Sequence, residues 1–322
     1  MKEQRTASQP DESQRDLRIR AAWIYYVEGH TQSETARMMG LNRIAVTRLL
    51  SEARRRGEVT ITIASDLTET VTLERDLEER FGLEKAIVAP FSDAGGDPTN
   101  AIAAIAGPYI SSILRPNMTL GVGWGRTLHA TLSHLRPRAI EGLRVVSLLG
   151  GIAEARRFNP AEFAWQFAEA FDAEGFLVPA PALVDSPATR HALLEHCGIE
   201  QVFQQAESSD VALISCGGID GLTTSYRIGH IPEPARRSLK EAGAIGDILY
   251  NFVDASGALV EHGINERCVS MPLERLQRIP SRILMSGGVE KDVILRAALA
   301  SVRPTTIITD EASARRLLDG SP

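Results

Sequence analysis

From residue 85 to the end of the chain, short apolar runs rich in β-branched residues alternate with amphipathic helical stretches. The predicted strands span residues 86–89, 119–122, 145–149, 176–178, 211–215, 282–285 and 306–309. The predicted helices cover residues 99–114, 127–135, 161–171, 188–195, 234–242, 289–300 and 311–318. A parallel strand pair needs a crossover connection, and a helix usually supplies it. The alternation therefore predicts an α/β domain whose doubly wound, mostly parallel sheet is covered by helices on both faces.

Four of the predicted strands end in glycines. The loops contain Gly123, Trp124, Gly125, Arg126 and Thr127 after the second strand, Gly150 and Gly151 after the third, Gly217 and Gly218 after the fifth, and Gly287, Gly288 and Lys291 after the sixth. Glycine lets backbone N–H groups approach an anion at the carboxyl end of a parallel strand. A tight turn explains any one of these loops equally well. Together they predict one shared pocket for an oxygen-rich, anionic ligand.

Asp247 follows another glycine-containing loop and is a candidate for holding sugar hydroxyls or acting as a base; a helix cap or turn residue is the equal alternative. The dinucleotide-binding fingerprint fails, because Arg126 stands where its third glycine belongs. The three cysteines (Cys197, Cys216 and Cys268) lie far apart, without the spacing of metal ligands. We therefore expect neither a cofactor nor a metal.

Residues 29–57 predict two short helices around a tight turn. Thr31 and Glu34 match a capping box, so a helix should start at Gln32. Gly40 can adopt the left-handed conformation that ends this helix, and Asn42 is a suitable N-cap for the next one. This arrangement of cap, glycine turn and second helix is typical of a helix-turn-helix motif.

Winding the second helix at 3.6 residues per turn separates an apolar stripe from a polar, basic face. The stripe consists of Val46, Leu49, Leu50 and Ala53, and the opposite face carries Ile44, Thr47, Arg48, Ser51 and Arg55, with Arg43 beside it. A surface helix pair with solvated arginines is the simplest alternative. A preceding apolar-periodic helix at residues 16–28 and an alternating strand at residues 59–63 favour a DNA-binding winged helix-turn-helix instead.

Charge is distributed unevenly along the chain. The net charge is −6, yet residues 1–65 carry eleven Lys and Arg against eight Asp and Glu. Attraction to phosphate acts over a Debye length of about 10 Å, so a basic helix on an acidic chain can still bind DNA. We expect a disordered tail over residues 1–15, a DNA-binding domain over 16–64 and a ligand-binding, oligomer-forming domain over 65–322.

The chain shows no membrane-spanning or secretion pattern. No apolar run approaches the roughly 20 residues that span a bilayer, and the first residues lack the apolar core of a secretion signal. Reduced, buried cysteines are the simplest interpretation of an odd and scattered set. These features predict a cytoplasmic protein with no membrane partner.

Six stretches, in matching order and spacing, resemble the SorC family of sugar-responsive bacterial transcriptional regulators. They are TQSETARMMGLNRIAVTRLLSEARRRGEVTITI, LGVGWGRTL, VVSLLGGI, GAIGDILYNFVDASG, ILMSGGVEKDVILRAAL and IITDEASARRLL. The resemblance covers nearly the whole chain. It implies a second domain similar in fold to the phosphosugar isomerases, a phosphorylated sugar or polyol as effector, and a dimer or tetramer of identical chains.

The resemblance also implies positions for the effector. Its phosphate end would lie at residues 123–127 and at Gly287, Gly288 and Lys291, with Asp247 near the sugar hydroxyls. This chain carries Trp124 and Arg126 where other members have small or hydroxyl residues. An unphosphorylated polyol is therefore an alternative effector.

The expected function is that of an effector-controlled transcriptional regulator of a carbohydrate or polyol operon, without enzymatic activity. Arg43, Thr47 and Arg48 would contact base edges or phosphates of double-stranded operator DNA, and Gln32 and Asn42 would anchor the motif to the DNA backbone. One alternative is a sugar-phosphate isomerase-like enzyme with an appended DNA-binding head and Asp247 as its base. Another is an architectural DNA-binding oligomer, which would not need the pocket.

Overall fold

The computed structural model describes residues 10–59, 68–91, 93, 95–152, 159–220 and 231–320. The chain divides into two compact units, Met1–Asp66 and Leu67–Pro322. We call the first unit the head and the second the sheet unit. Within the described ranges, no helix is both long enough and apolar enough to cross a bilayer.

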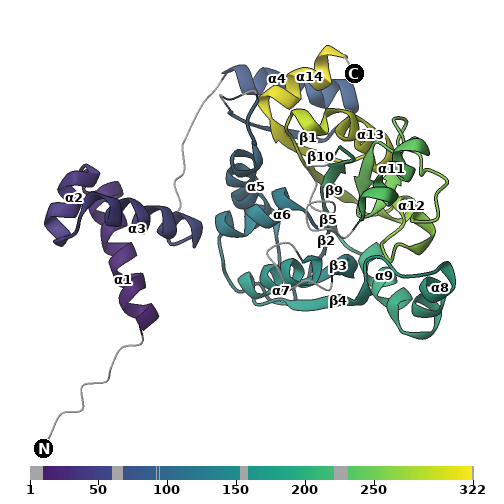
Figure 1. Ribbon diagram of the computed structural model, residues 1–322, viewed down its shortest axis with the longest axis horizontal. Coiled ribbons are helices and arrows are strands. Elements are labelled where there is room, and N and C mark those ends of the chain that lie inside the picture. The colour runs from purple at the N-terminus through teal and green to yellow at the C-terminus, as the bar shows by residue number, and fades with distance from the viewer. Residues whose placement is uncertain are drawn as a thin grey trace, which may run out of the picture. The chain divides into compact units, whose positions relative to one another are not determined.

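The described part of the head consists of helices (Figure 1). They are α1 (Pro10–Ala22), which continues into the π-helical turn η1 (Trp23–Val27), α2 (Gln32–Met39) and α3 (Arg43–Arg55). α1 begins at Pro10, so residues 10–15, which the sequence assigned to a tail, are helical. The predicted strand at residues 59–63 lies, beyond Val59, outside the described residues.

The predicted helix boundaries around the turn are confirmed. Thr31 and Glu34 form the capping box, with the Thr31 N–H donating to Glu34 Oε2 at 2.8 Å and the Glu34 N–H donating to Thr31 Oγ1 at 3.3 Å. Gly40 ends α2 in the left-handed region at φ 66°. The short turn to Arg43 brings α2 and α3 together over a small core of buried side chains: Ala21, Ala22, Ala36, Val46, Leu50 and Ala53.

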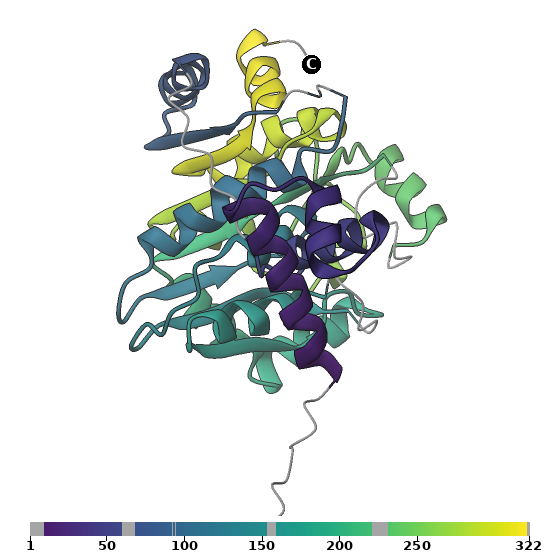
Figure 2. The same cartoon turned by 90° about the vertical axis from the view of Figure 1, so that its left-hand side faces the viewer.

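The sheet unit contains a seven-stranded parallel sheet in the order β1-β10-β9-β5-β2-β3-β4 (Figures 1 and 2). Its strands are β1 (Lys85–Ala89), β2 (Thr119–Val122), β3 (Arg144–Gly151), β4 (Glu174–Pro181), β5 (Val211–Ile214), β9 (Ser281–Met285) and β10 (Thr306–Asp310). Every neighbouring pair in this sheet is parallel. All seven predicted strands are members of it, so the predicted α/β fold with a mostly parallel sheet is confirmed.

Helices cover both faces of this sheet, as Figure 1 shows. One face packs against α5 (Thr99–Ile113), α6 (Arg126–Thr131) and α7 (Pro160–Ala170). The other packs against α4 (Thr68–Phe81), α9 (Ile199–Glu207), α13 (Asp292–Val302) and α14 (Glu311–Asp319). Alternate residues of one strand serve the two cores, because successive side chains point to opposite faces: Leu213 of β5 joins the first core, and Ala212 and Ile214 join the second. The other helices in the described part of this unit are α8 (Pro187–His196), α11 (Glu233–Glu241), α12 (Leu273–Leu276) and the short turns η2 (Leu132–His134), η3 (Asn265–Arg267) and η4 (Val289–Lys291).

The edge strand β1 is protected by α4. The N–H of Ala86 donates to Glu78 Oε1 and that of Val88 to Glu74 Oε1, both at 2.9 Å. An unpaired row of edge N–H groups is a template for aggregation, and these carboxylates occupy it.

A second, antiparallel sheet was not predicted. It consists of β6 (Cys216–Gly218), β7 (Gly246–Ile248) and β8 (Asn251–Val253), in that order. Each strand has only three residues. A run of this length shows no measurable alternation, so periodicity could not reveal it.

Candidate functional site

The exposed face of α3 carries two arginines that are available to a ligand. The side chains of Arg43 and Arg48 are exposed and make no hydrogen bond or ion pair with any described residue. Ile44, in the same helix, is 74% exposed. Arg55, predicted for this face, is instead paired with Glu52, its Nε donating to Oε2 at 2.9 Å. Arginine and apolar groups are the side chains that contact guanine edges, phosphates and thymine methyl groups.

The other three residues predicted to contact DNA are engaged within the head. Asn42 Oδ1 accepts the N–H of Ala45 at 2.8 Å and so caps α3. The Thr47 hydroxyl lies 3.0 Å from Gln32 Oε1 and 2.9 Å from the carbonyl oxygen of Arg43. The Gln32–Thr47 bond ties the start of α2 to α3. These residues position the exposed face, and their own contact with DNA stays a prediction.

A buried ion pair between Arg18 and Glu58 links α1 to the segment after α3. Neither residue was predicted from the sequence. Arg18 Nε donates to Glu58 Oε2 at 2.7 Å and Nη2 to Oε1 at 2.5 Å, and the two side chains are only 5% and 12% exposed. The hydrogen bonds and charge of Arg18 lower the pKa of Glu58 against the opposing effect of burial. The two residues lie 40 positions apart, so no local pattern marks them.

In the sheet unit, a pocket of about 300 Å³ lies at the carboxyl ends of the parallel strands. The connections β1–α5 and β9–α13 line it with Gly95, Gly96, Asp97, Pro98, Gly287, Gly288, Val289 and Glu290. Ligands of parallel α/β sheets bind in this position, and small-molecule sites have volumes from about 300 Å³ upwards. The pocket thus includes the predicted Gly287 and Gly288.

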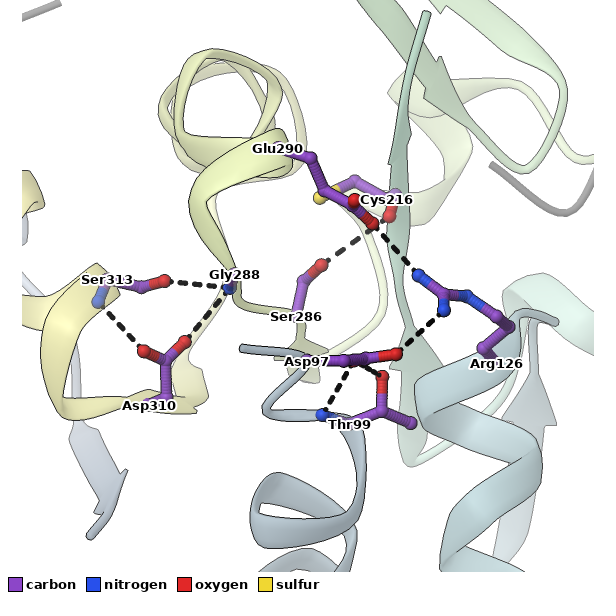
Figure 3. A network of polar contacts seen from close by, with 9 residues as sticks. All are labelled: Asp97, Thr99, Arg126, Cys216, Ser286, Gly288, Glu290, Asp310 and Ser313. Carbon is purple, nitrogen blue, oxygen red and sulfur yellow. Dashed lines mark hydrogen bonds and ion pairs between the residues drawn. The ribbon is translucent and has the colours of Figure 1, made fainter. Parts of the chain in front are cut away.

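Packing accounts for the two glycines of the β9–α13 connection. A Cβ on Gly287 would lie 2.1 Å from Asp310 Oδ2. Gly288 has φ 99°, and its N–H donates to Asp310 Oδ2 at 3.0 Å and to Ser313 Oγ at 2.9 Å (Figure 3). The Gly288 amide, predicted to face a phosphate, is therefore bound to protein oxygens in this structure.

Arg126, the first residue of α6, bridges two carboxylates of the pocket lining. Its Nη1 donates to Asp97 Oδ2 at 2.8 Å and its Nη2 to Glu290 Oε1 at 2.9 Å (Figure 3). Burial raises the pKa of Asp97, but hydrogen bonds from Thr99 and the charges of Arg126 and Lys291 outweigh it and lower the pKa. Neither carboxylate was predicted, because they lie 29 and 164 positions from Arg126 in sequence.

Three further predicted residues, Thr127, Asp247 and Lys291, are buried polar groups. Burial raises the pKa of Asp247 to about 6, although the N–H of Tyr250 and the charge of Lys291 oppose the shift. Burial lowers the pKa of Lys291. Among the described residues, Thr127 Oγ1 and the Lys291 ammonium have no hydrogen-bond partner. Leaving buried polar groups unpaired is costly, so these atoms are suited to a ligand that satisfies them.

A strained hairpin carries Asp247. Its two-residue turn, Leu249 and Tyr250, has φ values of 53° and 61°, and such non-glycine residues cost about 1–3 kcal/mol each. The Tyr250 ring stacks on Trp124 with centroids 5.3 Å apart, and a Cβ on Gly123 would lie 2.7 Å from Leu249 Cδ2. The predicted Gly123 and Trp124 therefore support this turn by packing.

Gly150 and Gly151 serve the β3–β4 pair, away from the pocket lining. A Cβ on Gly150 would lie 2.5 Å from the carbonyl oxygen of Ala180, and the carbonyl of Gly151 accepts the N–H of Ala182 at 2.7 Å. Gly125 precedes α6 with φ 135°, a conformation that favours glycine. Of the four glycine loops predicted to share a pocket, only the loop with Gly287 and Gly288 lines the pocket described above.

The comparisons with known proteins agree with this architecture. Residues 65–319 match the Sugar-bind family, described as a sugar-binding domain. The chain is 30% identical to the erythritol catabolism regulatory protein EryD of Brucella abortus, over 95% of this chain and 97% of the relative. The full-length sorbitol operon regulator SorC of Klebsiella pneumoniae has a similar structure, with a TM-score of 0.69 and 27% identity over 95% of this chain and 99% of the other. The chain belongs to the SorC family.

This SorC-family chain is also 28% identical to the deoxyribonucleoside regulator of Bacillus subtilis, over 96% of its own length and 99% of that protein. All residues predicted for the effector fall within the matched range 65–319, and those predicted for DNA precede it. In the described part of the chain, no group of three or more His, Cys, Asp or Glu residues is arranged to hold a metal ion.

Proposed function

We propose that the chain is an effector-responsive DNA-binding transcriptional regulator of a carbohydrate or polyol catabolic operon. The observation that carries the proposal is that one chain joins an exposed helix, whose Arg43 and Arg48 side chains have no partner within the described ranges, to a pocket at the carboxyl ends of a parallel sheet. The names of its relatives, which concern erythritol, sorbitol and deoxyribonucleosides, support carbohydrate or polyol control.

In this proposal α3 lies in the major groove of operator DNA. Arg43, Thr47 and Arg48 contact base edges or phosphates, and Gln32 and Asn42 hold the start of the motif against the DNA backbone. Ile44 adds an apolar contact of the kind that reads a thymine methyl group. An arginine that binds a base specifies sequence, whereas one that binds a phosphate adds affinity regardless of sequence.

The effector is a sugar phosphate or a polyol, bound between the glycine loops and the buried polar groups. Lys291 and Thr127 would take its anionic or hydroxyl oxygens, and Asp247 would accept hydrogen bonds from hydroxyl groups. The chain acts as a homo-oligomer, a dimer or a tetramer. The effector changes operator affinity only if it binds two arrangements of that oligomer with different affinity.

The DNA-binding part is tested with an operator duplex selected in vitro from fragmented genomic DNA. Arg43→Ala and Arg48→Ala should each weaken binding about 5- to 150-fold, the loss of about 1–3 kcal/mol expected for one base contact. If one of them binds a phosphate instead, its removal should reduce the salt dependence by about one counterion and leave selectivity unchanged. Arg237→Ala removes an exposed arginine of α11 and is the matched control. Wild-type affinity and selectivity in both head variants would contradict the proposal.

The effector part is tested by thermal unfolding with sugars, polyols and their phosphates in matched pairs. A ligand that raises the unfolding temperature should also change operator affinity. An architectural protein would show neither effect. We also propose that the pocket binds without turnover; conversion of any sugar phosphate by the purified protein would favour the isomerase-like alternative, with Asp247 as its base.

A further inference from the structure

One arginine holds together three of the loops that follow parallel strands. Arg126 belongs to α6, after β2; Asp97 belongs to the connection from β1 to α5; and Glu290 belongs to η4, after β9. Its two guanidinium nitrogens bind the two carboxylates at 2.8 and 2.9 Å (Figure 3). Asp97 is held in turn by Thr99, whose hydroxyl and N–H both donate to Oδ1. The bridge therefore joins the starts of α5, α6 and η4.

Unpaired polar groups lie directly next to this bridge in the chain. Thr127 follows Arg126, and its buried hydroxyl has no partner among the described residues. Lys291 follows Glu290, is 6% exposed, and has no carboxylate within ion-pair distance in the described ranges. Lys291 also interacts electrostatically with Arg126, Glu290 and Asp97, so the described residues place one cation without an ion-pair partner close to one neutralised cation. An anionic group is what both cations would bind.

Asp97 and Glu290 oppose such an anion as the site stands. Both line the pocket, so a phosphate entering it meets two carboxylates, and the arginine that could bind it is already occupied. A phosphate carries about two negative charges and binds a guanidinium in a bidentate manner, which favours it over a single carboxylate. A neutral polyol has no charge with which to compete.

We propose that Asp97 and Glu290 determine whether this site accepts an anion, because an anionic group must take Arg126 from them. On binding, that group also contacts Thr127 and Lys291, and the starts of α5 and η4 are released from α6. A neutral polyol binds with the bridge intact. The inference rests on the proposed role of the pocket as the effector site, and it specifies what distinguishes the two effector classes.

The experiment measures the binding of inorganic phosphate to the full chain by isothermal titration calorimetry at fixed ionic strength. Glu290→Gln and Asp97→Asn each remove one competitor for Arg126 and should tighten phosphate binding about two- to five-fold, the range of a partly exposed ion pair. Arg126→Gln should weaken phosphate binding at least about tenfold. Arg126→Lys keeps the charge but cannot bind phosphate in a bidentate manner, so its phosphate affinity should lie between those of Arg126→Gln and the wild type. Erythritol affinity should be the same in all four variants.

The chain offers a closely matched control. The ion pair between Glu200 and Arg275 has the same length as that between Glu290 and Arg126, 2.9 Å. Its side chains are 37% and 17% exposed, and those of Glu290 and Arg126 are 35% and 17% exposed. Glu200→Gln should leave phosphate binding unchanged. Amide exchange adds a second readout: phosphate should accelerate exchange at the starts of α5 and η4 in the wild type, and Arg126→Gln should show this faster exchange without phosphate.

Unchanged phosphate affinity in Glu290→Gln, Asp97→Asn and Arg126→Gln would make the bridge purely structural and overturn the inference. An equal gain in Glu200→Gln would overturn it too, since the effect would then be one of net charge. The phosphate titration contains no DNA, so it tests this inference separately from the proposed regulatory function. If the variants show the expected phosphate affinities but no ligand changes operator affinity, the inference is supported and the regulatory function is contradicted.

Discussion

The ion pair between Arg18 and Glu58 should decide whether the head stays folded. The two side chains are 5% and 12% exposed and share two hydrogen bonds. Replacing Glu58 with Gln removes the carboxylate that accepts both of these hydrogen bonds from the buried Arg18 guanidinium. Breaking a buried pair in this way costs about 3–5 kcal/mol, and we expect about 3 kcal/mol in so small a unit.

That loss is large compared with the stability of the head. A unit of about 50 residues has a free energy of unfolding of about 2.5–7.5 kcal/mol at the usual 0.05–0.15 kcal/mol per residue. Four of the six buried residues in its core are alanines, which bury little apolar area. Glu58→Gln should therefore leave the head close to its unfolding midpoint while the sheet unit remains folded, and operator binding should fall with the folded fraction.

Amide hydrogen exchange with mass spectrometry separates the two units. In Glu58→Gln, peptides of α1, α2 and α3 should exchange much faster than in the wild type, and peptides of β2, β5 and β9 should be unchanged. Glu52→Gln is the control, because it removes a carboxylate that pairs with two arginines at the surface of the same unit. Replacing both partners by Met and Leu should restore most of the protection, since no charge is then buried. Wild-type exchange in the single Glu58→Gln variant would refute the reasoning.

The sign of the pH dependence follows from the same pair. Arg18 lowers the pKa of Glu58 in the folded state, so its contribution is fully present above the unfolded value of about 4.3 and is lost as pH falls through the lower folded value. The difference between the wild type and Glu58→Gln should accordingly shrink below about pH 4. A difference that persisted undiminished there would exclude the ion pair as its source.

Two further predictions concern the sheet unit. The pKa of Asp247 is raised from 3.8 to about 6, so the carboxyl group binds its proton more tightly in the folded state than in the unfolded state. Above about pH 6 the carboxyl group is ionised in the folded state, and its buried charge destabilises the fold. Asp247→Asn should raise the free energy of unfolding by about 3 kcal/mol near pH 7.5, and the gain should vanish between pH 6 and 4; a gain independent of pH in thermal unfolding would contradict this. Gly287→Ala places a methyl group 2.1 Å from Asp310 Oδ2, which accepts the Gly288 N–H while Oδ1 accepts that of Ser313. Displacing that carboxylate should cost about 3–5 kcal/mol, whereas Gly263→Ala, with nothing within 4 Å, should be nearly neutral in urea unfolding.

The elements that local chemistry specifies could be predicted. The strands of the large sheet are apolar runs rich in β-branched residues, and the start of α3 is marked by Asn42, whose side chain caps it as expected. The sequence also predicted that Gly287 and Gly288, after a parallel strand, would line a pocket, but it did not predict the β1–α5 connection that forms the other half of the lining. The roles of those glycines were not: Gly150 and Gly287 are required by close contacts with Ala180 and Asp310.

The groups that give the pocket its charge could not be predicted. Asp97 looks like a turn residue before α5, and Glu290 looks like an exposed helix residue, until the fold brings both to Arg126. The antiparallel hairpin that buries Asp247 has strands too short to be recognised, and its turn uses Leu249 and Tyr250 where local rules expect glycine or asparagine. Tertiary packing against Trp124 overrides that preference.

By itself, the sequence determined the order of helices and strands, the parallel sheet and the caps of α2 and α3, because each depends on residues within a few positions of one another. Only the tertiary structure decided which charges are neutralised and which are free. Arg43 and Arg48 have no partner among the residues that the structure describes, while Arg126 and Arg18 are paired over long separations. Electrostatic energy depends on distance and burial in space, and neither can be read from separation along the chain.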